Sequence, residues 1–197
     1  MLPLATYHIS TLLLLGLLVA AAVIDLRCHR IPNLISLGGS IICLGLYIGL
    51  LGFGHEGLLT GLAGMGVGLL IFLPFYAMGG MGAGDVKLMA MAGTFLGPLH
   101  ALLAAGLALG AGSLMGLGIL LMRRGVAQMA RRHLSTLQCL TVTGKWSYVP
   151  PGEDQAAAIR FPYAAAIAVG TLITLWWSGT LSEFFYLSRS FLLWILN

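Results

Sequence analysis

Charged residues are scarce in this chain. Only 8% of its 197 residues are Asp, Glu, Lys or Arg, whereas 59% are hydrophobic. This composition excludes an ordinary water-soluble domain and is typical of helices that cross a membrane. We therefore expect an all-α fold, a polytopic bundle of about six transmembrane helices. At about 20 residues for each crossing there is no room for a separate soluble catalytic domain, so residues 1–197 are expected to form a single membrane-embedded domain.

Cysteine is scarce as well, since Cys28, Cys43 and Cys139 are the only three. They form no Cys-x-x-Cys pair, which argues against a zinc site and against a disulfide framework. No two of the five histidines lie four residues apart. We therefore expect no metal and no other cofactor. The chain also has no basic tail interleaved with aromatic residues, so the expected partner is the lipid bilayer and not nucleic acid.

The first span is expected from about Ile9 to Leu26. No Lys or Arg precedes this stretch, whereas Arg27 and Arg30 follow it. A secretory signal peptide has the opposite arrangement, with its positive charge first. Because positively charged residues prefer the cytoplasmic side of a membrane, the amino terminus is expected outside. Asp25 is then expected at the cytoplasmic end of the first span.

Short turns separate the later spans. Pro32 is expected to end one helix and Asn33 to cap the next. The loop at 52–57 contains no Lys or Arg, as expected for an outside loop. The fourth span is short and is expected to begin within the glycine-rich segment that precedes it. The spans expected after the first are 34–51, 58–78, 86–96, 101–122 and 161–177.

Six of the ten basic residues fall within 123–160, the long polar stretch between the fifth and sixth spans. We expect this stretch to be a cytoplasmic loop. The tail at 181–197 contains Glu183 and Arg189 in an apolar run that is too short to span comfortably. We expect it to form an interfacial helix.

Several glycines recur at a spacing of four residues within the expected spans. This spacing allows membrane helices to approach closely, so it predicts a tight bundle. The pairs are Gly45/Gly49, Gly64/Gly68, Gly106/Gly110 and Gly112/Gly116.

A run of glycines precedes Asp85, since residues 79–85 are Gly-Gly-Met-Gly-Ala-Gly-Asp. Glycine has no Cβ and tolerates strained dihedral angles, so a polypeptide substrate or a neighbouring helix can come close to the acid. Gly82 and Gly84 are expected to support Asp85 in this way. Because the chain has 28 glycines, a simple turn between two spans is the alternative interpretation.

Asp25 and Asp85 are expected at the same face of the membrane, because two crossings separate them. Acids within or against apolar spans are costly and are usually functional. Two carboxylates brought close do not both ionise easily and can share a proton. Such a pair suits an aspartic peptidase, in which one acid activates water and the other protonates the leaving nitrogen. Asp85 begins the fourth span, where the helix dipole favours a negative charge, so it is the better candidate base.

Three segments together resemble the type IV prepilin peptidase family. They are Asp25 followed by Arg-Ile-Pro-Asn at 30–33, Gly-Ala-Gly-Asp-Val-Lys-Leu at 82–88, and Arg-Phe-Pro-Tyr-Ala-Ala-Ala at 160–166. The resemblance implies an intramembrane aspartic peptidase of the Gly-x-Gly-Asp type, with Asp25 and Asp85 as its catalytic dyad. It implies a bacterial inner-membrane enzyme that removes the basic leader of type IV prepilins or pseudopilins at the cytoplasmic face. The Tyr-Asp element of presenilin-like proteases is absent, since Ile24 precedes Asp25.

Long members of that family carry an amino-terminal cytoplasmic region with paired Cys-x-x-Cys motifs, which is associated with methylating the new amino terminus. This chain starts almost at its first span and has neither motif. It resembles the short form found with Flp-type tight-adherence pili, so we expect cleavage of a prepilin without methyl transfer.

Two other function classes are compatible with these residues. A proton- or cation-coupled transporter also uses buried aspartates, although its sites usually lie near the middle of the bilayer. A non-catalytic membrane assembly subunit would keep the helical bundle without needing both acids.

Overall fold

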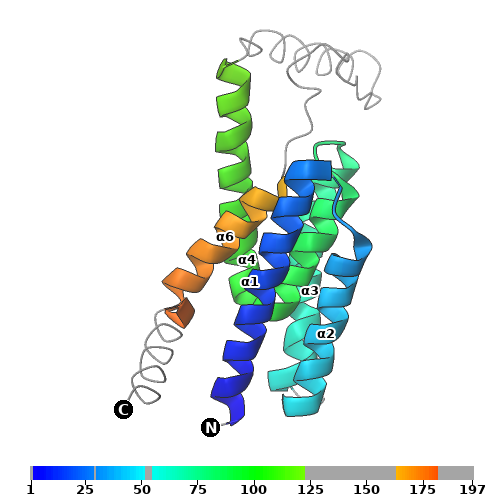
Figure 1. Cartoon of the computed structure of the whole chain (residues 1–197), viewed down its shortest axis with the longest axis vertical. Coiled ribbons are helices and arrows are strands. Elements are labelled where there is room, and N and C mark those ends of the chain that lie inside the picture. Colours follow the sequence, from blue (N-terminus) through cyan, green and yellow to red (C-terminus); the bar gives the residue numbers. More distant parts are fainter. Residues whose placement is uncertain (1, 29, 52–54, 123–162, 182–197) are drawn as a thin grey trace.

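The computed structural model describes residues 2–28, 30–51, 55–122 and 163–181. Its helices pack side by side as a bundle (Figure 1), which confirms the all-α prediction. The predicted loop at 123–160 and all but the first residue of the predicted helix at 181–197 lie outside the described residues. The elements are α1 (Leu2–Cys28), α2 (Asn33–Leu51), η1 (His55–Leu59), α3 (Thr60–Ala77), α4 (Ala83–Met122) and α6 (Tyr163–Trp177).

Within the described residues, three stretches are long and apolar enough to cross a membrane. They are 9–28 in α1, 57–77 in η1 and α3, and 83–118 in α4. Two shorter apolar helices cover 33–49 and 163–177. These lengths fit a membrane-embedded helical bundle, and the count of six spans stays a prediction.

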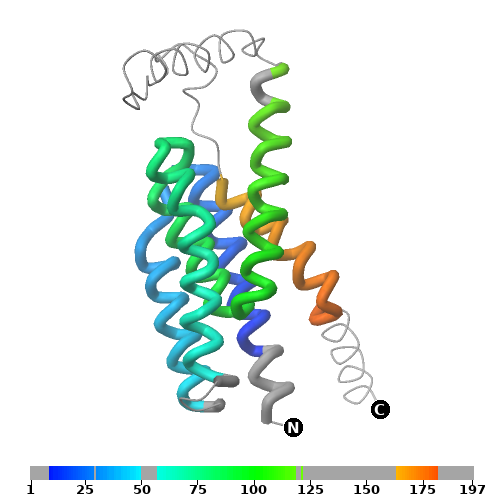
Figure 2. Tube along the Cα trace, turned by 180° about the vertical axis from the view of Figure 1, so that it is seen from behind, coloured from blue at the N-terminus to red at the C-terminus, as the bar shows by residue number. Residues whose placement is uncertain are grey.

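Helix α4 bends sharply at Gly97 into two arms, 83–96 and 98–122. Gly97 has φ +74° and ψ 172°, a conformation that glycine adopts without the strain of a Cβ. Pro98 then begins the second arm, where its fixed φ suits the first turn of a helix. The second arm turns back alongside the first (Figure 2), and a Cβ at Gly93 would lie 3.4 Å from that of Ala101. The bend falls at the predicted boundary between the fourth and fifth spans.

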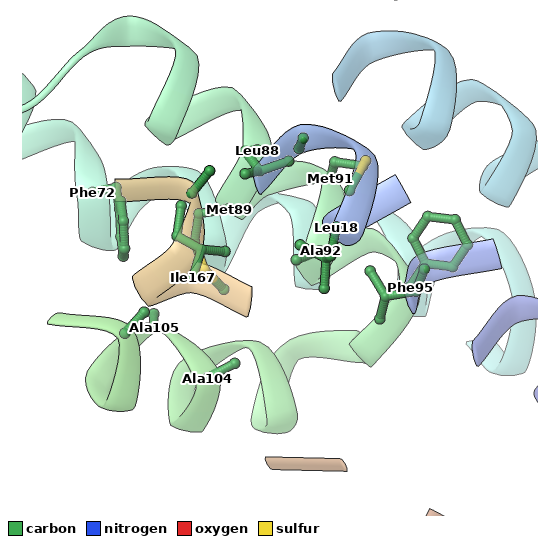
Figure 3. Close-up of a cluster of buried hydrophobic side chains, with 14 of the residues drawn as sticks. Leu18, Phe72, Leu88, Met89, Met91, Ala92, Phe95, Ala104, Ala105 and Ile167 are labelled. Atoms are coloured by element: carbon green, nitrogen blue, oxygen red, sulfur yellow. The ribbon is translucent and has the colours of Figure 1, made fainter. Parts of the chain in front are cut away.

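The first arm of α4 is the central helix of the bundle. It begins at Ala83, inside the glycine segment as predicted, and every residue from Leu88 to Phe95 is buried. A helix that is buried on all sides has to be apolar or small around its whole circumference. Figure 3 shows its side chains packed against Leu18 of α1, Phe72 of α3 and Ile167 of α6. The arm that carries Asp85 is therefore held from several directions.

Helix α3 and the first arm of α4 meet backbone to backbone. A Cβ added to Gly64 would collide with the carbonyl oxygen of Gly93, and a Cβ on Gly93 would collide with that of Gly64. One turn further along α3, a Cβ on Gly68 would lie 2.5 Å from the carbonyl oxygen of Met89. Only glycine allows helices to approach this closely. The packing prediction is confirmed for the Gly64/Gly68 pair.

The other glycine pairs do not act in the predicted way. Gly112 contacts a neighbouring helix, but a Cβ added to its partner Gly116 would meet nothing within 4 Å. A Cβ added to either member of the Gly45/Gly49 pair or of the Gly106/Gly110 pair would also meet nothing within 4 Å. A spacing of four residues places two glycines on one face of a helix, but it does not determine whether that face meets a neighbour. The exposed glycines of those pairs are Gly45, Gly49, Gly106 and Gly110.

Asn33 does not cap α2 in the predicted way. The carbonyl oxygen of Pro32 accepts hydrogen bonds from the backbone N–H groups of Ile35 at 3.0 Å and of Ser36 at 3.5 Å. Pro32 therefore takes the position before the first turn, and Asn33 is the first helical residue. The Asn33 side chain makes a different contact, described below.

Candidate active site

Segments that are distant in sequence meet at one end of the bundle. The end of α1, the start of α2, the turn between α3 and α4 and the start of α6 lie at this end, which is the upper one in Figure 1. Asp25 lies in the last turn of α1, and Asp85 lies in the first turn of α4. Both acids therefore lie at the same end, as the parity of the crossings predicts.

Asp25 is buried, with 6% of its surface exposed. Its Oδ2 accepts a hydrogen bond of 3.2 Å from the backbone N–H of Ala164. Ala164 lies in the first turn of α6, where backbone N–H groups lack helical partners and the helix dipole favours a negative charge. The start of α6 thus satisfies a carboxyl group whose burial would otherwise be costly. Sequence reasoning missed this contact, although the 160–166 segment was one of the three that carried the resemblance.

Asp85 caps the helix that carries it. Its Oδ2 accepts a 3.0 Å hydrogen bond from the backbone N–H of Gly82, while its own N–H donates to the Gly82 carbonyl oxygen at 3.1 Å. The acid thus reaches back from the third helical position to the residue before the helix, as in a capping box. Asp85 is partly exposed, unlike Asp25.

The glycines before Asp85 have separate structural roles. Gly79 has φ +75° and ends α3, since its N–H donates to the Tyr76 carbonyl at 2.9 Å and that of Gly80 donates to Phe75 at 2.8 Å. This is the Schellman pattern of a helix terminus, so the simple-turn interpretation is correct for the first two glycines. Gly84 differs, because a Cβ there would lie 3.2 Å from the Cβ of Ile31. The segment between α1 and α2 therefore packs directly beside the acid.

The two carboxyl groups are near enough for the charge of Asp25 to act on Asp85. A negative charge near a second carboxyl group makes the ionisation of that second group less favourable. Each acid also meets a helix N-terminus, Asp85 that of α4 and Asp25 that of α6. Helix N-termini therefore act on both acids, and the role of Asp85 as the base stays a prediction.

Lys87 binds Asn33 at the same end of the bundle. Its Nζ donates a hydrogen bond of 3.0 Å to the side-chain oxygen of Asn33. The bond connects the first residue of α2 with the fifth residue of α4, and it is charge-assisted because its donor is an ammonium group. Two of the segments that carried the resemblance, 30–33 and 82–88, are thus in direct contact through Ile31–Gly84 and Asn33–Lys87.

We expect the Lys87–Asn33 bond to be measurable as a coupling between two substitutions. Lys87→Met and Asn33→Ala should each lower the stability of the purified protein, and the double variant should lose less than the sum. The expected coupling is about 0.5–1 kcal/mol, because the bond is exposed and water competes for both groups. Thermal unfolding of the wild type, the two single variants and the double variant in one detergent measures the coupling. Strictly additive losses would show that the bond contributes nothing.

Within the described ranges, no group of three or more His, Cys, Asp or Glu side chains is placed to hold a metal ion. The candidate site is therefore described by its two acids, Asp25 and Asp85. Two carboxyl groups that share protons can act as a general acid and a general base.

The family model for the type IV leader peptidase family matches residues 12–122, more than half of the chain. The matched stretch contains both Asp25 and Asp85, and it favours the peptidase hypothesis over a transporter. Helix α6 lies beyond the match, so its contact with Asp25 is known from the structure alone. Neither a curated protein nor a solved structure matches the chain.

Proposed function

Because this chain belongs to the type IV leader peptidase family, and is a peptidase of that general kind, we propose that Asp25 and Asp85 form its catalytic dyad. The observation that carries the proposal is that both acids lie at the same end of the bundle, one in the last turn of α1 and the other in the first turn of α4. The substrate in this proposal is a type IV prepilin or pseudopilin with a basic leader, which the enzyme cleaves at the cytoplasmic face of the membrane.

The proposed reaction needs one proton shared between two carboxyl groups. The ionised acid accepts a proton from water while the water oxygen attacks the scissile carbonyl carbon. The protonated acid hydrogen-bonds the carbonyl oxygen and then gives its proton to the leaving nitrogen as the C–N bond breaks. One acid has gained a proton and the other has lost one, so the pair ends with the single proton with which it began.

The surroundings of the two acids support a mechanism in which one acts as the base and the other as the acid. Oδ2 of Asp25 is held by Ala164, and Oδ2 of Asp85 is held by Gly82, so each carboxyl group is oriented through one oxygen. Groups that are oriented before the reaction need less rearrangement to reach the transition state. Asp85 is also more exposed than Asp25, and a substrate entering at this end would reach it more easily.

Two finer expectations belong to the same proposal. The first is a substrate of the Flp type, and the second is cleavage without methyl transfer. The first follows from the resemblance to the enzymes found with Flp-type pili, and the second from the lack of a Cys-x-x-Cys pair in residues 1–197.

The direct test uses the purified chain in detergent micelles with a synthetic peptide that joins a basic leader to an apolar segment. We expect two products whose masses place a single cut at the end of the leader. A matched peptide with glutamine in place of the basic leader residues measures whether the leader is recognised by charge. An intact substrate after prolonged incubation with folded protein would reject the proposal.

The proposed orientation makes a separate prediction about labelling. In a background without Cys28, Cys43 and Cys139, single cysteines replace His55 and Arg131. A membrane-impermeant maleimide added to intact cells should label position 55 and leave position 131 unlabelled, because the basic loop is expected inside. Position 131 should react after the cells are opened. The reverse pattern would place both aspartates on the outer side.

A further inference from the structure

Tyr163, the first residue of α6, lies in a close-fitting site between two other helices. A Cβ added to Gly112, in the second arm of α4, would lie 2.6 Å from three atoms of the tyrosine, Cε2, Cζ and Oη. The ring also meets that of Phe72 from α3 edge to face, with the ring centroids 5.9 Å apart and the planes at 80°. Edge-to-face pairs of this kind are a favourable arrangement of aromatic rings. The ring therefore ties the start of α6 to both α3 and α4.

The same part of α6 connects with both acids. Ala164, the next residue, donates its N–H to Oδ2 of Asp25. The phenol of Tyr163 itself lies within the electrostatic reach of Asp85. Two consecutive residues of one helix thus act on the two carboxyl groups, which are carried by two other helices.

We propose that Tyr163 is a positioning residue for the dyad, which acts through the placement of its ring against Gly112 and Phe72. This inference rests on the proposed function of Asp25 and Asp85. The ring fixes the start of α6, so that the Ala164 N–H stays on Asp25. Displacing reacting groups by about 1 Å can cost about 100-fold in rate, so a small movement of this helix end has a large effect.

Gly112 provides a way to move the ring without changing the ring or either acid. In Gly112→Ala the new methyl group would meet the far end of a side chain, which can swing away, and not the backbone of another helix. Gly116 offers a matched control one turn further along the same arm, because a Cβ there would meet nothing within 4 Å. The two substitutions add the same methyl group to the same helix.

The test measures kcat and KM for leader cleavage, normalised to the folded fraction of each variant. We expect Gly112→Ala to lower kcat about tenfold or more with little change in KM, whereas Gly116→Ala stays within about twofold of the wild type. Tyr163→Ala should lower kcat at least as much, and adding Gly112→Ala to it should cause no further loss. Tyr163→Phe keeps the ring in its site and should retain more activity than Tyr163→Ala.

Equal rates for Gly112→Ala and Gly116→Ala, with an active wild type, would overturn the positioning role and leave the proposed function intact. An inactive wild type would instead count against the proposed function. If Gly112→Ala does not fold, Tyr163→Leu tests the positioning role instead, because it keeps an apolar side chain and removes the ring. A lowered kcat with unchanged KM in that variant supports the positioning role, and a kcat near that of the wild type rejects it.

Discussion

Replacing either Asp25 or Asp85 with asparagine should reduce leader cleavage by a factor of about 10³ or more. An amide can neither accept a proton from water nor donate one to the leaving nitrogen, so each single variant lacks half of the shared-proton system. General acid–base catalysis of this kind contributes about 10²–10⁴ in rate, and two acids that act as a unit are lost together. The rate of product formation by the purified variants, followed by mass spectrometry, measures the loss.

These two variants should fold, which separates a catalytic defect from a structural one. Oδ2 of Asp25 accepts one backbone hydrogen bond from Ala164, and Oδ2 of Asp85 accepts one from Gly82. An asparagine oxygen can accept the same bonds. We therefore expect membrane insertion and unfolding temperature close to those of the wild type. A variant that fails to accumulate would indicate that its carboxyl group is needed for the fold.

The second large effect is expected at the contact between α3 and the first arm of α4. Gly64→Ala would bring a Cβ against the carbonyl oxygen of Gly93, and backbone on both sides cannot rotate away as a side chain can. The helices must separate, and overpacking of this kind costs about 1–3 kcal/mol or more. We expect a clear fall in unfolding temperature in detergent, accompanied by slower cleavage because the displaced arm carries Asp85.

Gly66→Ala is the matched control for this prediction. Gly66 lies on the same helix, and a Cβ added there would meet nothing within 4 Å. Alanine is favoured over glycine inside a helix by about 0.5–1 kcal/mol, so this variant should be as stable as the wild type or more stable. If Gly64→Ala unfolds at the same temperature as Gly66→Ala, the two backbones are not in the contact described here.

Much of the fold could be predicted from the sequence because glycine and proline mark helix boundaries. Gly97-Pro98 separated two predicted spans, and the structure bends α4 at that point. The glycine pairs and the cap of α2 were less predictable. Spacing shows which residues share a helix face, but only the packing of other helices decides whether that face is buried. Asn33 is a residue type that often caps helices, but its side-chain oxygen accepts a hydrogen bond from Lys87, which is distant in sequence.

The candidate site could be predicted in part, because the helix boundaries determine how many crossings separate two residues. Counting crossings placed Asp25 and Asp85 at one end, which requires no knowledge of the packing. The contact of Ala164 with Asp25 joins residues 139 positions apart, and no local pattern encodes a contact of that range. The contact of Tyr163 with Gly112 is also not encoded locally. The spacing of Gly112 and Gly116 predicted a contact at both positions, and only Gly112 has one.

Asp25 and Asp85 should act together in cleaving the leader, and a comparison of four proteins decides whether they do. Wild type, Asp25→Asn, Asp85→Asn and the double variant are purified in the same detergent, shown to be folded, and incubated with the same prepilin-like peptide. We expect rapid release of the leader by the wild type and rates near background for all three variants, with the double variant no worse than either single one. Cleavage near the wild-type rate by either single variant would contradict it.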